Sequence, residues 1–286
     1  MIAKQQVAIQ LQLDVGNTRL KWRLLAFPCL QGDYLDAEGA HVRPENLLGR
    51  GFLVLADYKT IAAALAVLQQ QVQQALLGRA ITTLRAAIVA AEDVATAIDA
   101  WAQQAFAVQA QFAYVTAQAA GVTVGYDTPS MLGVDRWLAV LAASRYGSGG
   151  FVVVDCGSAV TVDLLSAGQH LGGYIVPGLR LMNRALFGDT ARVKVVADWQ
   201  TAEQTLEPGR NTAAAVTAGL PLMVVGLVQE VLRRQQNSSA SAHWKVLLAG
   251  GDARQLSALL PADMDWQLVD DLVLDGLLLA AVKPLD

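Results

Sequence analysis

The sequence predicts an α/β protein built from two similar halves. A strand–turn–strand pattern near the N-terminus recurs about half a chain length later. Apolar runs of strand length alternate with helical patterns between and after the two copies. The 286 residues are 54% hydrophobic and 16% charged, so the chain can bury a core large enough for one large domain or two medium ones.

Composition excludes several classes of protein. Lysine plus arginine number 21 and aspartate plus glutamate 25, which gives a net charge of −4 and no basic excess for a nucleic-acid backbone. Two cysteines, Cys29 and Cys156, are too few for a disulfide scaffold or a four-thiolate zinc site. His41, His170 and His243 are scattered and do not have metal-ligand spacing. We therefore expect no nucleic-acid partner and no zinc centre.

The N-terminal segment lacks the apolar core and cleavage site of a signal peptide, so a cytoplasmic protein with reduced thiols is expected. One uncharged stretch, 211–229, is long enough to span a bilayer. Its hydrophobicity is diluted by Asn211, two threonines, two glycines, Pro221 and Gln229. A buried helix is the favoured interpretation of this stretch, and no membrane partner is expected.

The repeated pattern consists of two turns. LQLDVGNTRLKWRLL begins at Leu11, and VVVDCGSAVTVDLL begins at Val152. Aligning Asp14 with Asp155 also aligns the glycine two residues later in each copy. An apolar run, a glycine-centred reversal and an alternating run are typical of a β-hairpin. Two copies in one chain indicate two similar lobes that face each other.

Helical patterns follow the first hairpin. Apolar residues at helical spacing predict a helix over 59–79 that stops at a glycine. A short strand is expected at 88–91, a helix at 92–106, and a helix that starts with residues 135–143 and ends near 146–150. The Gly/Ser cluster at 147–150 directly precedes the second hairpin and is the best domain boundary in the chain.

The second half continues the alternation of strands and helices. Helices are expected around 180–187 and over 211–235, and a strand at 245–249. The boundary divides the chain into residues 1–147 and residues 148–286.

The first turn is suited to holding a phosphate. Gly16 allows close backbone approach and can present N–H groups to an anion. Asn17 and Thr18 add short donors, Lys21 can reach a terminal phosphate, and Asp14 can hold Mg²⁺ mostly through water. An ordinary hairpin turn would use the same residue types. The second copy favours the functional interpretation, because two facing turns can clamp a nucleotide.

Two further segments are candidates for binding. In the segment YDTPSMLGVDRW (126–137), Asp135 offers a base, Arg136 a fork for a carboxylate, and Tyr126 a polar wall. Asp135 could instead cap the helix that follows. Gly250 and Gly251 follow a strand and could admit a flat purine ring; a Gly-Gly turn between a strand and a helix also needs no ligand. The absence of G-x-x-x-x-G-K-[ST] excludes a P-loop kinase.

Taken together, these segments resemble the type III pantothenate kinase family. That family belongs to the acetate and sugar kinase/Hsp70/actin superfamily. The resemblance is carried by LDVGNTRLKW, YDTPSMLGVDRW, VVVDCGSAVTVD, GGYIVPGLRLMNRAL, DTARV, NTAAAVTAGL and AGGDA, in the order of the family. It implies two duplicated ribonuclease-H-like lobes, an actin-like ATPase fold with an interlobe cleft, and it transfers nothing to residues 27–60.

The resemblance implies ATP-dependent phosphorylation of pantothenate to 4′-phosphopantothenate, the first step of coenzyme A biosynthesis. Asp135 would be the catalytic proton acceptor. The residues implied to bind ATP are Asp14, Val15, Gly16, Asn17, Thr18, Arg19, Leu20, Lys21, Ser158, Gly250 and Gly251. Those implied to bind pantothenate are Tyr126, Gly133, Val134, Asp135, Arg136 and Thr190.

The resemblance also implies cofactors and an assembly. Mg²⁺ would be held at Asp14 through water, and a monovalent cation, K⁺ or NH₄⁺, at Asp155. The family forms homodimers. Ser158 and Ala249 stand where the family often has threonine, so one methyl group and one possible hydrogen bond are lost.

Two alternatives remain open at this point. The first is a phosphotransferase of the same superfamily that acts on a sugar or a small carboxylate. The second is a non-catalytic accessory protein on the same scaffold; the presence of Asp14, Asp135 and Asp155 argues against it.

Overall fold

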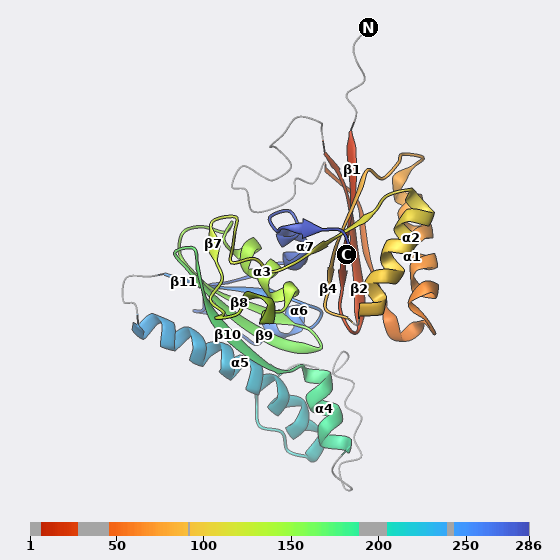
Figure 1. The fold of residues 1–286 in the computed structure, drawn as a ribbon. Coiled ribbons are helices and arrows are strands. Elements are labelled where there is room, and N and C mark those ends of the chain that lie inside the picture. Colours follow the sequence, from red (N-terminus) through yellow and green to blue (C-terminus); the bar gives the residue numbers. More distant parts are fainter. Residues whose placement is uncertain (1–6, 28–45, 91, 189–204, 239–242, 286) are drawn as a thin grey trace. The chain divides into compact units, whose positions relative to one another are not determined.

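The computed structural model describes residues 7–27, 46–90, 92–188, 205–238 and 243–285. The chain divides into two compact units (Figure 1). Unit 1 contains Met1–Tyr146 and Leu272–Asp286, and unit 2 contains Gly147–Asp271. The first division lies next to the Gly/Ser cluster. The C-terminal segment belongs to unit 1, whereas the sequence-based division placed it in the second half.

Unit 1 is built on a six-stranded sheet in the order β13-β5-β4-β1-β2-β3. β1, β2 and β3 are antiparallel neighbours, whereas β4 is parallel to β1 and β5 is parallel to β4. The strands are β1 Ala8–Val15, β2 Arg19–Phe27, β3 Leu47–Val54, β4 Thr83–Ile88, β5 Ala110–Ala113 and β13 Val282–Lys283. The strand expected at 88–91 was wrong in its position, since β4 ends at Ile88 and its alternating residues Leu84 and Ala86 are the buried ones.

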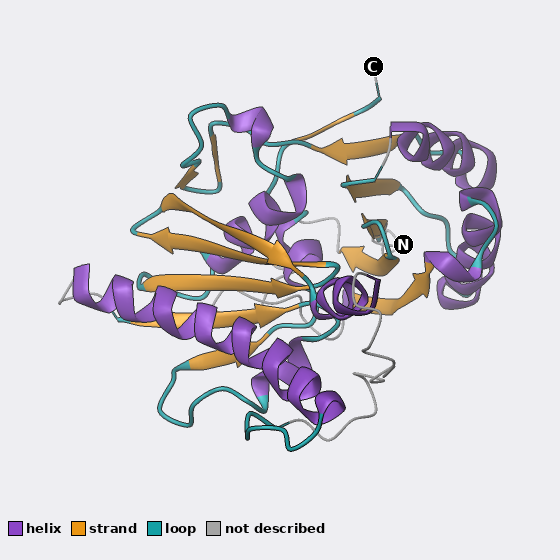
Figure 2. Ribbon diagram, turned by 90° about the horizontal axis from the view of Figure 1, so that it is seen from below, coloured by secondary structure: helices purple, strands orange, loops and turns teal. Residues whose placement is uncertain are grey.

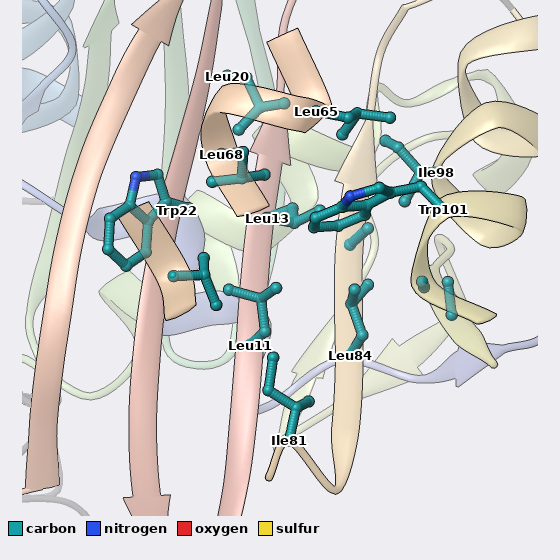
Figure 3. Packing of buried hydrophobic residues seen from close by; sticks show 14 of the residues in the cluster. Leu11, Leu13, Leu20, Trp22, Leu65, Leu68, Ile81, Leu84, Ile98 and Trp101 are labelled. Atoms are coloured by element: carbon teal, nitrogen blue, oxygen red, sulfur yellow. The ribbon is translucent and has the colours of Figure 1, made fainter. Parts of the chain in front are cut away.

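Two helices, α1 (Ile61–Leu76) and α2 (Glu92–Phe106), cover one face of this sheet (Figures 1 and 3). Both confirm helices expected from the sequence. Thr60 begins α1 by accepting a bond from the backbone N–H of Ala63, and Leu77 ends it in the left-handed region at φ 50°. The shared core contains alternate residues of β1 and β2 and the apolar stripes of the helices; examples are Leu11, Leu13, Leu20, Trp22, Leu65, Leu68, Ile98 and Trp101.

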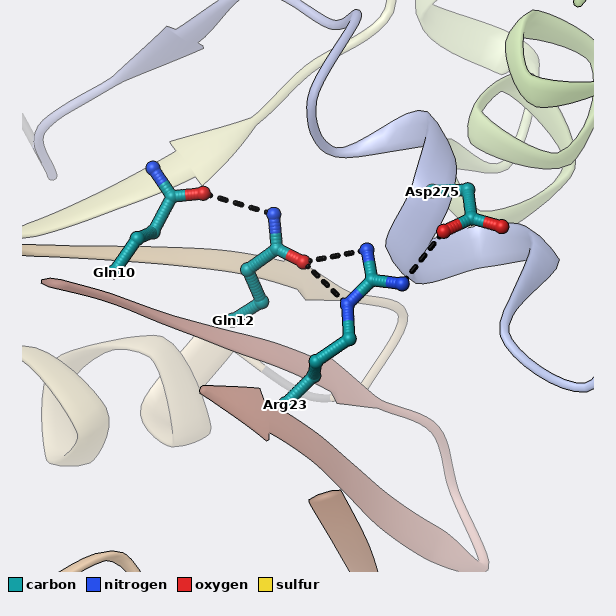
Figure 4. A network of polar contacts seen from close by, with 4 residues as sticks. All are labelled: Gln10, Gln12, Arg23 and Asp275. Atoms are coloured by element: carbon teal, nitrogen blue, oxygen red, sulfur yellow. Dashed lines mark hydrogen bonds and ion pairs between the residues drawn. The ribbon is translucent and has the colours of Figure 1, made fainter. Parts of the chain in front are cut away.

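The opposite face of the sheet is polar but buried (Figure 4). Gln10, Gln12 and Arg23 alternate with the core residues and are 6%, 0% and 3% exposed. Arg23 donates through Nη1 to Asp275 Oδ1 at 2.6 Å and through Nε to Gln12 Oε1 at 2.9 Å. Asp275 lies on the short helix α7 (Leu272–Gly276), 252 residues away in the sequence. A buried arginine is thereby compensated by the C-terminal segment.

The rest of unit 1 connects β5 to unit 2. This connection contains the hairpin of β6 (Gln118–Ala119) and β7 (Val122–Thr123), the short 3₁₀ helix η3 (Pro129–Met131) and helix α3 (Val134–Ala143). Another 3₁₀ helix, η2 (Leu55–Asp57), directly follows β3. α3 packs against α7 so closely that a β-carbon at Gly276 would overlap the backbone of Leu138.

Unit 2 repeats the strand pattern of unit 1. Its strands are β8 Gly150–Cys156, β9 Ala159–Ser166, β10 Gln169–Pro177, β11 Trp244–Ala249 and β12 Trp266–Leu268. They run in the order β12-β11-β8-β9-β10. β8, β9 and β10 are antiparallel, while β11 is parallel to β8 and β12 to β11. Strand order and directions match β5-β4-β1-β2-β3, so the internal duplication read from the two hairpins is confirmed.

The described residues of unit 2 also form three helices: α4 (Leu179–Gly188), α5 (Thr212–Ser238) and α6 (Ala253–Ser257). α5 lies along the sheet (Figure 2) and buries Val224, Val228 and Val231 in a core with alternate residues of β8, β9 and β11. It continues through Pro221. Residues 212–237 of α5 have the length and apolar character to cross a membrane, with a mean hydropathy of 1.8. In the most apolar stretch of this helix, 44% of the residues are buried within the protein.

Candidate functional site

The first turn joins β1 to β2 and is held by backbone hydrogen bonds. Val15 and Leu20 are the last paired residues, so four residues form the loop. The N–H of Gly16 donates to the carbonyl of Arg19 at 3.0 Å, and the N–H of Leu55 donates to the carbonyl of Thr18 at 2.9 Å. The turn is therefore fixed both by its own hairpin and by the end of β3.

The side chains at this turn separate into two groups by the strand alternation. Asp14 and Lys21 are cross-strand partners on the polar face, and both are half-buried. Val15 and Leu20 point the other way and are fully buried in the core. If these two residues contact a ligand, they do so through their backbone groups.

The second turn joins β8 to β9 and is one residue shorter than the first. Cys156 pairs with Val160, which leaves three residues in the loop, and the N–H of Gly157 donates to the carbonyl of Ala159 at 3.0 Å. Asp155 faces Thr161 across the hairpin, whereas Asp14 faces Lys21. The two turns are therefore alike in backbone position but differ in charge, since the second has no lysine at this place.

Two glycines from distant segments lie against the second turn. Gly178, just before α4, donates its N–H to the carbonyl of Ser158 at 3.0 Å, and a β-carbon there would overlap the carbonyl of Gly157. Gly250 has φ +97°, and a β-carbon on it would overlap Asp155 Oδ1. Both positions need glycine because the backbone approaches the turn too closely for a side chain.

Acidic groups gather at the second turn. Asp252 is 5% exposed and its N–H donates to the carbonyl of Cys156 at 3.0 Å. The Cys156 thiol is 1% exposed, and its burial, followed by the nearby charges of Asp155 and Asp252, raises its pKa well above the ordinary value. This thiol is a neutral core group and not a nucleophile at neutral pH.

A third group of residues, the α3 cluster, consists of Tyr126, Gly133, Asp135 and Arg136. Gly133 is the N-cap of α3, and Asp135 lies in its first turn with Oδ1 accepting the N–H of Arg136 at 2.8 Å. A β-carbon at Gly133 would lie 2.7 Å from Asp135 Oδ1. The carboxyl group therefore folds back over the helix N-terminus, where the helix dipole favours negative charge.

Arg136 is buried and is held by Tyr126. Its Nη1 donates to the Tyr126 hydroxyl at 2.7 Å, and its guanidinium carbon lies 5.6 Å from the centre of the tyrosine ring. The segment before η3 and the first turn of α3, ten residues apart, thus make one polar group. Val134, the first residue of α3, is half-buried beside it.

The structure brings the expected residues into three places: the first turn, the second turn with Gly250, and the α3 cluster. Gly251 is exposed next to Gly250. Thr190 lies outside the described residues. Within the described ranges no three His, Cys, Asp or Glu side chains converge on a metal position. A divalent ion held at the Asp14 carboxylate would therefore take most of its ligands from water and phosphate oxygens, as Mg²⁺ commonly does.

Sequence reasoning missed two residues that contact the second turn from elsewhere in the chain. Asp252 follows the glycine pair Gly250-Gly251, and Gly178 precedes α4; both make backbone bonds to the turn. The signals were a carboxylate directly after a Gly-Gly pair and a Pro-Gly pair at the start of a helix. Neither signal says which distant loop the residue will contact.

Comparison with known proteins identifies relatives over most of the chain. The family model for type III pantothenate kinase matches residues 10–234. A type III pantothenate kinase of Pseudomonas putida KT2440 is 37% identical over 278 residues, covering 96% of this chain and 99% of the relative. That of Chromohalobacter salexigens is 37% identical over 249 residues, covering 86% of this chain and 78% of the relative.

Solved structures show the same fold at low sequence identity. A protein from Campylobacter jejuni described as a Baf family transcriptional activator has a TM-score of 0.53 at 19% identity, with 93% of this chain and 94% of that chain covered. The ethanolamine utilization protein EutJ from Carboxydothermus hydrogenoformans has a TM-score of 0.50 at 13% identity, with 94% and 88% covered. At such identities the likeness concerns the fold, an α/β architecture with two related sheets.

Proposed function

The chain belongs to the type III pantothenate kinase family, and from this membership we propose that it transfers the γ-phosphoryl group of ATP to pantothenate, with 4′-phosphopantothenate and ADP as products. The observation that carries the proposal is the 37% identity to a type III pantothenate kinase along nearly the whole of both chains. Asp14, Asp135 and Asp155, the three carboxylates on which the chemistry depends, are all present.

We assign the phosphates of ATP to the first turn. Phosphoryl transfer builds negative charge on the transferred group, and enzymes catalyse it chiefly by positioning and by electrostatic stabilisation. Lys21, the cross-strand partner of Asp14 on the polar face of the sheet, supplies a positive charge. The backbone N–H groups of the turn and the side chains of Asn17 and Thr18 supply hydrogen-bond donors. Gly16 keeps the backbone open to a phosphate. Val15, Arg19 and Leu20 complete the proposed ATP-binding segment.

Asp14 is the proposed position for Mg²⁺. The chemistry of the donors fits, since a single half-buried carboxylate beside a phosphate-binding turn suits an ion that keeps several waters. When bound, Mg²⁺ neutralises charge on the phosphate oxygens. Asp14 would orient this ion through its water ligands, while Lys21 would contact the phosphates directly.

The second turn is the proposed position for a monovalent cation and for a further contact to ATP. The Asp155 carboxylate lies against the Gly250 backbone, and it offers the oxygen donors that K⁺ or NH₄⁺ requires. Ser158 retains the hydroxyl for a phosphate contact despite the missing methyl group. Gly250 and Gly251 would lie beside adenosine.

The α3 cluster is the proposed site for pantothenate. Asp135 would accept the proton of the primary hydroxyl of pantothenate. As it does so, the hydroxyl oxygen forms a bond to the γ-phosphorus, and the bond between that phosphorus and the oxygen of the leaving ADP breaks. Such a base is worth about 10²- to 10⁴-fold in rate. Arg136, preoriented by Tyr126, would hold the substrate carboxylate or amide. Gly133, Val134 and Thr190 are further proposed contacts to pantothenate.

We also propose that the protein acts in the cytoplasm as a homodimer, with neither nucleic acid nor membrane as a partner. The net charge of −4 supports the absence of a nucleic-acid partner. Sedimentation of the purified protein would test the dimer.

The decisive experiment is a coupled assay of ADP formation with ATP, with and without pantothenate and with and without K⁺. We expect ADP to form only when pantothenate is present, and faster with K⁺. Sugars and small carboxylates are offered in parallel as acceptors. Turnover of one of these in place of pantothenate would overturn the proposed substrate, and ADP formation unaffected by K⁺ would overturn the cation site.

A further inference from the structure

An aromatic ring lies beside the first turn, in the segment 27–60, to which the resemblance in sequence assigned no role. Phe52 is on β3, directly across from Lys21 on β2. Its side chain is 57% exposed. The guanidinium carbon of Arg19 lies 5.3 Å from the centre of the Phe52 ring, which is within the range of a cation–π interaction.

Arg19 has no carboxylate partner within the described part of unit 1. Its Nε is buried and donates no hydrogen bond. A buried donor left without an acceptor costs free energy, so such a group in a folded protein calls for an explanation. Arg19 as a whole is only half-buried, and Nε is the one nitrogen of its guanidinium that is buried without a partner, so the two terminal nitrogens are the donors that an anion can reach. A guanidinium binds phosphate through parallel N–H bonds from such a planar edge.

The ring leaves those donors available. A cation–π contact uses the flat face of the guanidinium, while the five N–H groups point outward in its plane. Phe52 can therefore fix the position of Arg19 and leave its hydrogen-bonding edge for an anion. The N–H of Leu55, three residues after Phe52, donates to Thr18 in the first turn, so the ring and the turn are connected by backbone.

We propose that Phe52 is a positioning residue for ATP, which holds the Arg19 guanidinium in place to bind a phosphate group at the first turn. The proposal rests on the proposed function in one respect, the assignment of ATP phosphates to this turn. It adds to that function a residue that does not itself contact the phosphate and that acts only through Arg19.

The test is equilibrium binding of the non-hydrolysable analogue AMPPNP with Mg²⁺, and separately of adenosine, by calorimetry. For Phe52→Leu we expect the Kd for AMPPNP to rise about three- to fivefold, the loss expected of one exposed cation–π contact, with no change for adenosine. Arg19→Gln should raise the Kd for AMPPNP about tenfold or more, as the loss of charge-assisted hydrogen bonds predicts. Phe52→Tyr, which keeps the ring, should restore affinity to within about twofold.

The double variant separates positioning from direct contact. If Phe52 acts through Arg19, adding Phe52→Leu to Arg19→Gln produces no further loss. Three results would each overturn the proposal. Phe52→Leu could weaken AMPPNP binding as much in the Arg19→Gln protein as in the wild type, it could weaken adenosine binding as much as AMPPNP binding, or it could leave AMPPNP binding unchanged. Tyr114→Leu, a change at another exposed aromatic residue of unit 1, serves as the control and should bind both ligands normally.

These measurements contain no acceptor, so they are independent of pantothenate. A protein that binds AMPPNP as expected but does not phosphorylate pantothenate would contradict the proposed substrate and leave the role of Phe52 standing. In the kinetic assay, Phe52→Leu should raise KM for ATP with kcat nearly unchanged, because a ground-state contact to ATP has been weakened.

Discussion

At the scale of single residues, the candidate site is built by backbone geometry as much as by side chains. Gly178 and Gly250 let two distant segments touch the second turn, and Gly133 lets the Asp135 carboxyl fold over the start of α3. Each of these glycines lies next to a residue with a proposed chemical role. Residue identity at the glycines therefore controls where the reactive groups are held.

Asp135→Asn should lower kcat by at least about 10²-fold, because the amide cannot accept the hydroxyl proton. The side chain keeps its size, and its oxygen can still accept the N–H of Arg136, so α3 and ATP binding should be nearly unaffected. Steady-state kinetics and AMPPNP calorimetry would measure the two effects separately. Near-normal turnover by this variant would remove Asp135 as the base.

The Cys156 thiol should resist alkylation in the folded protein. Its pKa is raised by burial and by Asp155 and Asp252, so it stays neutral where an unfolded thiol, with a pKa near 8.5, ionises. Its contribution to stability is full below the unfolded pKa and is lost as pH rises toward the higher folded pKa. Iodoacetamide labelling at pH 8.5 would be followed in a Cys29→Ser background with and without urea. Equal labelling rates in the two conditions would contradict the burial.

At the scale of elements, the two hairpins share their frame but differ at the loop. One residue fewer in the second turn places Thr161 where the first hairpin has Lys21. The same strand pattern thus offers a cation at one turn and a hydroxyl beside an acidic group at the other. Duplicated elements can serve different ligands because the backbone is repeated and the side chains are not.

β3 shows how glycine can shape an element by making room for a neighbour. The Trp22 ring lies across Gly49 and Gly51, and its Nε1 donates to Gln71 of α1 at 3.0 Å. A β-carbon at Gly51 would lie 2.8 Å from that nitrogen. The two glycines therefore allow a large ring to link the edge of the sheet to the helix above it.

Gly51→Ala should destabilise the protein by about 1–3 kcal/mol, since the Trp22 ring must shift and its bond to Gln71 is strained. Urea unfolding would measure the change. The matched control is Gly226→Ala on α5, where a β-carbon has nothing within 4 Å. That change should instead stabilise by about 0.5–1 kcal/mol, through helix propensity. A Gly51→Ala protein as stable as the wild type would show that the ring is not confined.

At the scale of the whole molecule, the C-terminal segment completes unit 1. Arg23 on β2 is compensated by Asp275, and Arg85 Nη1 donates to the carbonyl of Leu277 at 3.1 Å. In unit 2 the residue that corresponds to Arg23 is Asp163 on β9. Asp163 is also buried, and its Oδ1 lies 2.9 Å from Nε2 of His170. Each unit thus buries one charge at the same place in its sheet and compensates it differently.

Asp275→Ala should lower the free energy of unfolding by about 3–5 kcal/mol, because it leaves the buried Arg23 charge without its partner. Denaturant unfolding would measure this loss. Asp270→Ala is the control, since Asp270 pairs with Arg254 at 3.5 Å on an exposed surface and should cost no more than about 1 kcal/mol. Equal losses in the two variants would contradict a special role for the C-terminal segment.

Much of the fold could be predicted from local pattern. Strand alternation around Asp14 and Asp155 predicted both hairpins, and helical spacing predicted α1, α2 and most of α5. The position of β4 was predicted wrongly, because the apolar run that continues past Ile88 conceals the strand's end. Local patterns succeed where the determining hydrogen bonds and buried faces lie within a few residues of each other.

The sequence by itself determined the duplicated turns, the carboxylates on them and the family to which they belong. Only the tertiary structure decided that Gly178 and Asp252 contact the second turn, that Tyr126 holds Arg136, that Phe52 lies on Arg19, and that Asp275 compensates Arg23. These contacts join residues from 10 to 252 positions apart. They depend on which strands become neighbours in a sheet, and that is settled by the packing of whole elements and not by the residues adjacent in the chain.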